Sequence, residues 1–466
     1  MILYFIVCLL LATTTLAVQQ KRVVTLLGIL FYTAHIALLS ALIWGTLYSS
    51  VSALFFTFDA LGTLFFALLT LVSAFVFAHS LSYLKGCNLR EYRLYFAFLM
   101  LFTAAITGVY FSNNMAVTWI FLEATTLCAA GIVYHHRTAQ ALEAAWKYVF
   151  VCSTGIAIAY LGILLFSTAA AGGSLSYAEL SRTAATGNPL YIKTAFLLIL
   201  CGYSCKMELF PLYTVGVDAN FAAPTPAAAL ISTGLVNAGF VAIYRIYKVV
   251  LTTDAADWMR AVLIITGLLS LAVGAFFLRR TNNYKRFLSY STVENMGIVA
   301  IGLGIGGIGV WAAVFHIACH TLIKSSLFLQ TAVLHNIYND YSINRIGDYI
   351  RVNKVGAIGC IVGTVVLLAF PPSPLFISEL MILKQIIAQS GWWLAAALLV
   401  LLCIVIYALC SRMIRLCYQP NQDAVHITPI DRQLSRSALI LLLIALGFGL
   451  WQPELLCTWI DQIVML

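Results

Sequence analysis

The sequence predicts an all-α protein that crosses a membrane many times. Of its 466 residues, 62% are hydrophobic and only 9% are charged, whereas a soluble domain carries roughly a quarter charged residues. Apolar stretches of about 20 residues, the length that a membrane-spanning helix needs, follow one another along the chain. Lysine and arginine residues collect between alternate stretches, which is typical of a multi-span membrane protein. These three observations exclude a soluble enzyme.

The N-terminal unit, residues 1–92, contains the first three predicted helices. They lie near residues 2–18, 23–47 and 55–83. The first of them lacks the basic n-region and the small-residue cleavage site of a signal peptide, so we interpret it as a retained membrane helix.

Two central units of five predicted helices each follow. Residues 93–248 hold helices near 93–112, 115–134, 142–167, 192–217 and 225–247, and the segment 168–190 is interpreted as an external connector. Residues 249–418 hold helices near 259–278, 285–306, 309–334, 355–389 and 391–411. The C-terminal unit, residues 419–466, adds a helix near 434–451, so that about fourteen membrane-spanning helices are predicted.

The basic residues predict the orientation of these helices. Loops after odd-numbered helices hold seventeen of the 26 lysine and arginine residues, and loops after even-numbered helices hold five. The positive-inside rule then places the odd loops in the cytoplasm and both termini outside. The four remaining basic residues fall within apolar stretches; they are Lys147, Lys206, Lys324 and Lys384.

Prolines interrupt helices 7 and 12, the fourth helix of each central unit. Pro211 follows Lys206 in helix 7, and the run FPPSPLF (370–376) precedes Glu379 in helix 12. A proline in a membrane helix frees a backbone carbonyl group, which is tolerated where protein or water surrounds it. Because each unit has an odd number of helices, helices 4–8 and 9–13 are expected to form two inverted repeats. Paired broken helices of this kind are typical of transporters.

Ionisable residues recur at matching positions of the two units. The second helix of each carries a glutamate, Glu123 or Glu294, and the third carries a lysine, Lys147 or Lys324. The broken helices carry Lys206 with Glu208 and Glu379 with Lys384. A charged side chain at the bilayer centre costs at least about 2.5–3.5 kcal/mol, so a chain with several of them is expected to bind or move ions.

Two histidines add a possible proton relay. His316, His320 and Lys324 are spaced at i, i+4 and i+8, so they share one helix face. Histidine titrates near neutral pH and suits a relay; the alternative is that these groups stabilise helix packing through buried hydrogen bonds. The predicted proton-translocation residues are Glu123, Lys147, Lys206, Glu294, His316, His320, Lys324 and Glu379.

Five weaker candidates have simpler alternative roles. They are Asp59, Glu143, Glu208, Asn237 and Lys384. Glu143 and Lys147 are spaced i, i+4, so an ordinary surface ion pair is the alternative for both. Lys384 could extend to the membrane interface, and Asp59 could itself be an interfacial residue.

No segment of the sequence predicts a bound cofactor. The 12 cysteines are scattered without a CxxC or Cys/His set, and there is no Walker A, dinucleotide-binding or haem-attachment motif. We therefore expect no metal or cofactor site in this chain. The net charge of +9 comes from the basic loops, so a nucleic-acid partner is not expected.

Four segments together point to a known family. They are 206–239 with APTPAAAL (223–230), YKRFLSYSTVENMG (284–297), HIACHTLIKSSLF (316–328) and PPSPLFISEL (371–380). In this order they resemble the antiporter-like subunits shared by respiratory complex I, Mrp-type cation/proton antiporters and membrane-bound group 4 NiFe hydrogenases. LEAAWKYVF (142–150) and STVENMG look most similar to component F of hydrogenase and formate-hydrogenlyase complexes.

This resemblance implies a role for several residues. Glu123 and Lys206 match the glutamate of helix 5 and the lysine of helix 7 in the family. Lys324, with both histidines, matches its central axis, and Glu379 matches its terminal acidic residue. Relatives often carry lysine or histidine on helix 8, where this chain has Ser232 and Asn237. After the helix-7 lysine the family usually has Trp-Leu-Pro-Asp; here Val215, Gly216 and Val217 depart from that motif and Asp218 matches it, and Glu208 is unusual.

The resemblance also implies the setting in which the chain works. It would be a non-catalytic, proton-translocating subunit of a redox-driven complex in the cytoplasmic (inner) membrane of a prokaryote. Its partners would be the lipid bilayer, other membrane subunits and a peripheral redox arm, with iron–sulfur clusters and a nickel–iron site in those partner subunits. One alternative is a subunit of a Na⁺/H⁺ antiporter or inorganic-carbon uptake transporter without redox chemistry. Another is a structural subunit whose charges are vestigial.

Overall fold

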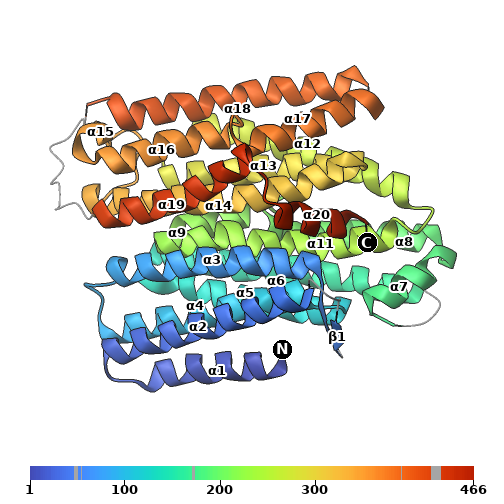
Figure 1. Ribbon diagram of the computed structural model, residues 1–466, viewed down its shortest axis with the longest axis horizontal. Helices are drawn as coiled ribbons and strands as arrows, with labels where there is room; N and C mark the ends of the chain where they lie inside the picture. The colour runs from blue at the N-terminus through green and yellow to red at the C-terminus, as the bar shows by residue number, and fades with distance from the viewer. Residues whose placement is uncertain (47–50, 54, 170–173, 390, 421–431, 466) are drawn as a thin grey trace.

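The computed structural model describes residues 1–46, 51–53, 55–169, 174–389, 391–420 and 432–465. Its long helices run side by side, with the N-terminal helices at one edge of the bundle and α18 at the other (Figure 1). Eleven of the described helices are long and apolar enough to cross a membrane. The predicted fold class, an all-α multi-span membrane protein, is confirmed, whereas the number of fourteen spans and the inverted repeats stay predictions.

The N-terminal unit departs from the prediction at the start of its third helix. Helices α1 (Ile2–Ala17) and α2 (Lys21–Thr46) lie where expected, but α3 (Ala60–Tyr83) begins five residues later than predicted. The preceding residues form two short antiparallel strands, β1 (Val51–Ala53) and β2 (Phe56–Phe58). The Asp59 carboxylate then accepts a hydrogen bond from the Gly62 backbone N–H at 2.8 Å and caps α3.

The first central unit contains the expected helices and one short helix that was not expected. The order is α4 (Leu89–Phe111), α5 (Met115–Val133), η1 (Tyr134–His136), α6 (Ala139–Ala169), α7 (Tyr177–Thr183), η2 (Ala184–Thr186), α8 (Pro189–Met207) and α9 (Thr214–Ala222). A last span runs without a gap through α10 (Thr225–Leu230), the π-helix η3 (Ile231–Leu235) and α11 (Val236–Val250). Helix α7 lies within the segment that was interpreted as a connector.

The second central unit has the same order of long helices. It consists of α12 (Ala256–Arg280), α13 (Tyr284–Ile305), α14 (Ile308–Tyr338), α15 (Tyr349–Val352), α16 (Lys354–Leu367), α17 (Pro374–Gln389) and α18 (Trp392–Tyr418). The C-terminal unit contains α19 (Arg432–Leu450) and also α20 (Glu454–Met465), a short helix that the sequence analysis did not predict.

Both predicted helix breaks are confirmed. Helix 7 is divided into α8 and α9, and helix 12 into α16 and α17. Serine side chains bind the backbone groups that the breaks release. Ser270 Oγ accepts from the Phe210 N–H at 2.9 Å in the first break, and Ser373 Oγ donates to the Val366 carbonyl at 2.7 Å in the second. The freed polar groups are therefore satisfied inside the protein, as a membrane interior requires.

The centre of the bundle lies between the two central units. The most apolar windows of the span Thr225–Val250 and of α14 are entirely buried, whereas those of α2 and α18 are only 28% buried. Helix α14 contacts helices of all the units, namely α3, α10, α13, α16, α17 and α19. Side chains on its faces can therefore join groups that are far apart in the sequence.

The two termini lie at the same end of the bundle (Figure 1). Phe5 of α1 packs against Phe56 of β2, with ring centroids 5.6 Å apart, and Ile463 of α20 lines a cavity together with Asp59. The side of the membrane on which this end lies stays a prediction.

Candidate functional site

The first cluster surrounds the ammonium group of Lys206 at the C-terminal end of α8. The side chain is fully buried. Its Nζ donates to Thr126 Oγ1 at 2.7 Å and to the Tyr148 hydroxyl at 3.4 Å. Thr126 Oγ1 in turn donates to Glu123 Oε2 at 3.3 Å, and Ser153 Oγ donates to Glu123 Oε1 at 2.7 Å. Lys206 and Glu123 are therefore joined through one hydroxyl group and form no direct ion pair.

Local helix geometry explains this cluster. Glu123 and Thr126 are three residues apart on α5, so their side chains are neighbours on one face. Lys206 is the penultimate residue of α8, where the partial negative charge of the helix terminus favours a cation. A hydroxyl that accepts from an ammonium and donates to a carboxylate can pass a proton between them.

The second cluster surrounds Lys324 near the middle of α14. This side chain is also fully buried. Its Nζ donates to the backbone carbonyl of Leu288 and to Ser291 Oγ on α13, the latter at 2.5 Å. Glu294 follows Ser291 by three residues on the same helix and is buried as well. Among the described residues, Lys324 has no carboxylate within ion-pair distance.

The third cluster continues from Glu294 towards α17. Asn295 Nδ2 donates to Glu294 Oε2 at 2.7 Å, and Asn295 Oδ1 lies 3.0 Å from His316 Nε2. The other ring nitrogen of His316 lies 2.9 Å from Ser378 Oγ. Glu379, the residue after Ser378, is partly exposed. A continuous chain of polar groups therefore runs from α13 across α14 to the broken helix 12.

His320 of α14 and Asn237 of α11 lie next to this chain of polar groups. The rings of His316 and His320 are nearly parallel, with centroids 6.5 Å apart, and His320 Nε2 is buried without a hydrogen-bond partner in the described part of the chain. Asn237 Nδ2 donates to Thr321 Oγ1 at 2.9 Å. Asn237 is the second residue after the π-helix η3. Segments of π-helix are frequent at functional sites.

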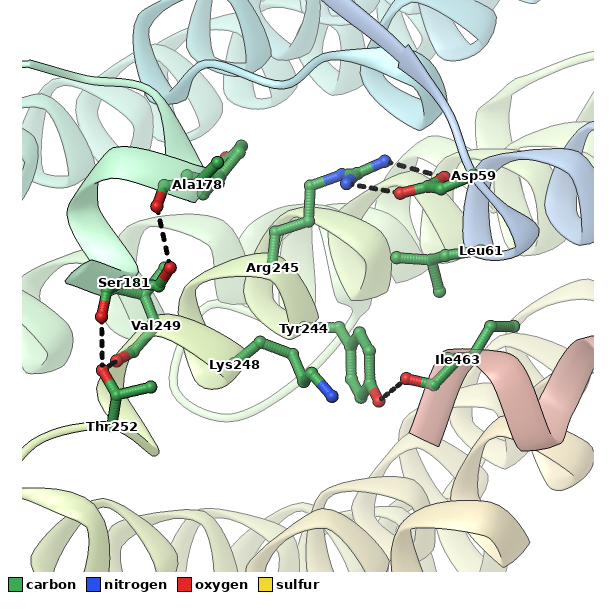
Figure 2. A pocket seen from close by; sticks show the side chains of 11 residues that line it. Asp59, Leu61, Ala178, Ser181, Tyr244, Arg245, Lys248, Val249, Thr252 and Ile463 are labelled. Atoms are coloured by element: carbon green, nitrogen blue, oxygen red, sulfur yellow. Dashed lines mark hydrogen bonds and ion pairs between the residues drawn. The ribbon is translucent and has the colours of Figure 1, made fainter. Parts of the chain in front are cut away.

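Asp59 lies apart from these clusters, at the end of the bundle that holds the termini. Its carboxylate binds both guanidinium nitrogens of Arg245, at 2.8 and 3.2 Å, as Figure 2 shows. The two side chains are only 16% and 10% exposed. They line a cavity of about 290 Å³, in which Lys248 and Tyr244 point towards Ile463 of α20 (Figure 2). This ion pair joins the start of α3 to α11.

Besides Asp59, three predicted residues lie outside the buried clusters. For Lys147 and Glu143 the structure shows the surface ion pair that was the alternative, and their role in proton translocation stays a prediction. Lys147 and Glu143 form a 2.5 Å ion pair on the outer face of α6, with 59% and 63% of the two side chains exposed. Trp146 and Phe150, on either side of Lys147, are 65% and 73% exposed, so this face of the helix points away from the core. Lys384 is exposed on α17.

Neutral polar residues of the clusters were missed by the sequence analysis. The hydroxyl groups of Thr126, Ser291 and Ser378 and the amide of Asn295 connect the charged groups. Their spacing from a glutamate by one residue or one helical turn was the available signal. Lys285 was also missed as a site residue: it is buried, and its Nζ donates to the carbonyls of Phe221 and Ala223 at 2.8 and 2.5 Å.

Together, the clusters form a row of titratable groups, and within the clusters hydroxyl and amide groups bind these titratable groups. Such a row can hold and pass protons, because each neutral group can donate and accept. The described residues contain no group of three histidine, cysteine or carboxylate side chains placed to hold a metal ion.

Comparison with known sequences gives one family and several relatives. Residues 112–405, more than half of the chain, match the model of the family "NADH:quinone oxidoreductase/Mrp antiporter, TM". A hydrogenase-4 component F homolog of Methylacidiphilum infernorum is 29% identical over 360 residues, which cover 75% of this chain and 74% of that protein. A probable K(+)/H(+) antiporter subunit of Rhizobium meliloti is 27% identical over 71% of this chain and 32% of its own length. Hydrogenase-4 component B of Escherichia coli is 25% identical over 69% of this chain and 49% of its own length.

Solved structures share the fold over nearly the whole chain. A chain of an archaeal membrane-bound sulfane sulfur reductase aligns with a TM-score of 0.88 at 21% identity and covers 99% of this chain and 97% of its own. A chain of the Mrp complex from Dietzia sp. gives 0.87 at 17% identity, with 99% and 96% covered. A chain of respiratory complex I from Thermus thermophilus gives 0.81 at 19% identity, with 97% and 98% covered.

Proposed function

This chain belongs to the family of NADH:quinone oxidoreductase/Mrp antiporter transmembrane subunits, and on that premise we propose that it translocates protons as an antiporter-like subunit of a redox-driven complex. The observation that carries the proposal is the row of groups from the partly buried Glu123 to the buried Lys206, Lys324, Glu294 and His316. Each charged group in the row has a neutral polar neighbour that can relay a proton.

The first half of the row moves a proton between Glu123 and Lys206. When the Lys206 ammonium gives a proton to Thr126 Oγ1, the hydroxyl gives its own proton to Glu123 Oε2 along the existing hydrogen bonds. The products are a neutral amine and a neutral carboxylic acid. Burying neutral groups in a low-dielectric interior costs less than burying charges, and this transfer needs no helix movement.

In the second half of the row, the protonation of Lys324 and Glu294 depends on the charges of nearby groups. Lys324 is held by a carbonyl and a hydroxyl group, and both it and Glu294 lie in a buried region. Two unit charges about 10 Å apart at an effective dielectric constant of about 20 interact by about 1.7 kcal/mol. A proton that arrives about 10 Å from a titratable group would therefore change the protonation equilibrium of that group by more than tenfold.

The partners that we propose follow from the relatives. The component F homolog and component B of hydrogenase-4 are named as parts of hydrogenases, and the structural neighbours are chains of multi-subunit membrane complexes. We therefore place this chain among other membrane subunits, next to a peripheral redox arm. We propose that iron–sulfur clusters and a nickel–iron site lie in that arm.

The proposed location is the cytoplasmic membrane of a prokaryote, with both termini on the outer side. The excess of lysine and arginine in the odd-numbered loops supports this orientation. Protons are the proposed ion, since lysine and histidine are proton carriers and offer no oxygen ligands to a sodium ion.

A second candidate function is that of a component in a cation/proton antiporter without redox chemistry. It is favoured by the fold of the Mrp complex and by the 27% identity to the probable K(+)/H(+) antiporter subunit of Rhizobium meliloti. Purification of the tagged chain from membranes, followed by mass spectrometry, separates the two. Hydrogenase-type or quinone-reductase subunits are expected; recovery of only antiporter subunits would contradict the redox assignment.

Proton translocation itself is tested in the purified complex, reconstituted in vesicles and driven by its redox substrates. Lys206→Ala and Glu123→Gln should abolish acidification of the vesicle lumen. Lys354→Ala, which removes an exposed lysine at the start of α16, serves as the matched control and should leave acidification intact. Normal acidification in the Lys206 and Glu123 variants would refute the proposed function.

A further inference from the structure

The two lysine clusters are separated by a gap that no hydrogen bond crosses in the described part of the chain. The Lys206 cluster is built from α5, α6 and α8, and the Lys324 cluster from α13 and α14. Glu208 stands between them in the chain, in the break that follows α8. It is 1% exposed, and neither half of the row as described above uses it.

The conformation of Glu208 is unusual for a glutamate. Its φ of 55° lies in the left-handed region, which is unfavourable for residues with a Cβ by roughly 1–2 kcal/mol. Glycine would avoid this cost at the end of a helix. A strained residue that is neither glycine nor asparagine is a reason to look for a function.

The carboxylate of Glu208 has an unused buried oxygen. Oε1 accepts a hydrogen bond from Asn220 Nδ2 at 2.8 Å. Oε2 has no partner in the described residues, and neither has Asn220 Oδ1. An unsatisfied buried polar atom costs about 1–3 kcal/mol, and more if the group is charged. A proton on Oε2 would remove the charge and could be donated to Asn220 Oδ1 or to a water molecule.

The fold makes room for this carboxylate at one glycine. A Cβ added at Gly216 would lie 2.5–2.7 Å from Cγ, Oε1 and Cδ of Glu208, which is closer than side chains approach. Gly216 and Glu208 both depart from the pattern of the family, and the structure shows that they are in contact. The two departures are therefore linked. Glycine at position 216 on α9 leaves the space that the Glu208 side chain fills, on the other side of the break.

Glu208 lies near both clusters. Its hydrogen-bond partner Asn220 is on α9, and the Tyr148 hydroxyl on α6 accepts a hydrogen bond from Lys206. Helix α9, which carries Gly216 and Asn220, packs against both α6 and α13. We infer that Glu208 relays protons between the Lys206 cluster and the Lys324 cluster, an inference that rests on the proposed function.

The relay consists of two balanced transfers. In the first, an N–H bond of the Lys206 ammonium breaks and an O–H bond forms on Glu208, directly or through water, leaving a neutral amine and a neutral carboxylic acid. In the second, that O–H bond breaks and an N–H bond forms on the amine of Lys324. The proton is the only species that moves, and no oxidant or reductant is involved.

The test uses the reconstituted complex and a small set of variants. Glu208→Gln keeps an oxygen that can accept from Asn220 but cannot carry a proton, and Glu208→Asp keeps the carboxyl group. Gly216→Ala displaces the carboxylate without removing it. Glu179→Gln, on the exposed side of α7, is the matched control. Lys206→Ala reports on the proposed function itself.

The expected result is a proton flux at least about tenfold lower in Glu208→Gln and Gly216→Ala, because a positioned proton carrier contributes on the order of 10²–10⁴ to a transfer rate. Glu208→Asp should retain part of the wild-type flux. The control Glu179→Gln should have the same flux as wild type. Infrared spectra of the wild-type complex should show the carbonyl stretch of a protonated carboxyl group that is lost in Glu208→Gln, a signal that a purely structural role would not produce.

Two other results would overturn the inference in distinguishable ways. If Lys206→Ala stops the flux while Glu208→Gln pumps normally and the carbonyl band is unchanged, the relay is wrong and the proposed function stands. If neither variant affects the flux, the proposed function fails and the relay fails with it.

Discussion

Replacing Thr126 by valine should interrupt proton transfer in the first half of the row. Valine has the shape of threonine without its hydroxyl group, so the packing around residue 126 is kept. The change removes the hydrogen bond from Lys206 Nζ at 2.7 Å and the one to Glu123 Oε2 at 3.3 Å. Lys206 keeps only the longer bond to Tyr148, at 3.4 Å.

The size of the effect follows from these contacts. A hydrogen bond to a charged group is worth about 1.5–3 kcal/mol, and each 1.36 kcal/mol on a barrier is tenfold in rate. If the lost bond to Lys206 is present in the transition state of proton transfer, the flux of Thr126→Val falls about 10- to 100-fold. Thr126→Ser keeps a hydroxyl group on the same carbon and should restore most of the flux.

Acidification of vesicles that contain the reconstituted complex measures the flux, and redox turnover is recorded in the same sample. The matched control is Thr154→Val on α6, where the hydroxyl donates only to the carbonyl of Phe150 within its own helix. Full proton flux in Thr126→Val, with redox turnover equal to wild type, would refute the idea that this hydroxyl carries the proton.

Three further changes test other parts of the structure. Ser291→Ala leaves the Lys324 ammonium with the Leu288 carbonyl alone, and the flux should fall while the complex still assembles on a native gel; unchanged flux would remove Ser291 from the path. Lys147→Met should affect neither the flux nor the melting temperature in detergent, because its ion pair with Glu143 is exposed to the surroundings of the chain; a lost flux would return Lys147 to the path. Asp59→Asn keeps the cap of α3 and weakens the pair with Arg245, whereas Asp59→Ala removes both; the alanine variant should be the less stable of the two by about 1 kcal/mol, and equal melting temperatures would contradict the capping role.

The spans and their breaks could be predicted from the sequence, because a lipid environment permits few backbone conformations. Every backbone polar group inside lipid must find a partner within the protein, so an apolar stretch of sufficient length becomes a helix. Pro211 and the prolines of the run at 370–376 lack the backbone N–H groups that a helix needs. Helices α8 and α16 end before them. The shared face of His316, His320 and Lys324 followed from the helical repeat alone.

The short elements could not be predicted, since tertiary contacts decide them. The strands β1 and β2 are three residues each and lie in a stretch as apolar as the helix that follows. Helix α20 packs Trp459, Ile460 and Ile463 against the bundle, and its sequence alone does not show that such a partner surface exists.

The sequence also could not separate Lys147 from Lys206. In a soluble helix the outward face is polar, so periodicity shows which residues are inside. In a membrane both faces are apolar, because one packs on protein and the other meets lipid or a neighbouring protein. Lys147 and Lys206 are each surrounded by hydrophobic residues in the sequence, yet the first is exposed and the second is buried.

The two buried lysines share an arrangement that suits proton transfer better than a direct ion pair does. Within the described residues neither Lys206 nor Lys324 has a carboxylate within ion-pair distance; a threonine stands between Lys206 and Glu123, and a serine on the same helix as Glu294 binds Lys324. At an effective dielectric constant of about 20, two unit charges attract by about 4 kcal/mol at 4 Å and by about 2.8 kcal/mol at 6 Å. The additional spacing weakens the attraction by a little over 1 kcal/mol, close to tenfold in an equilibrium constant. A lysine held in this way is bound less strongly to its carboxylate than in a direct ion pair, and neutralising that carboxylate removes the remaining attraction, which is the behaviour that a relay needs.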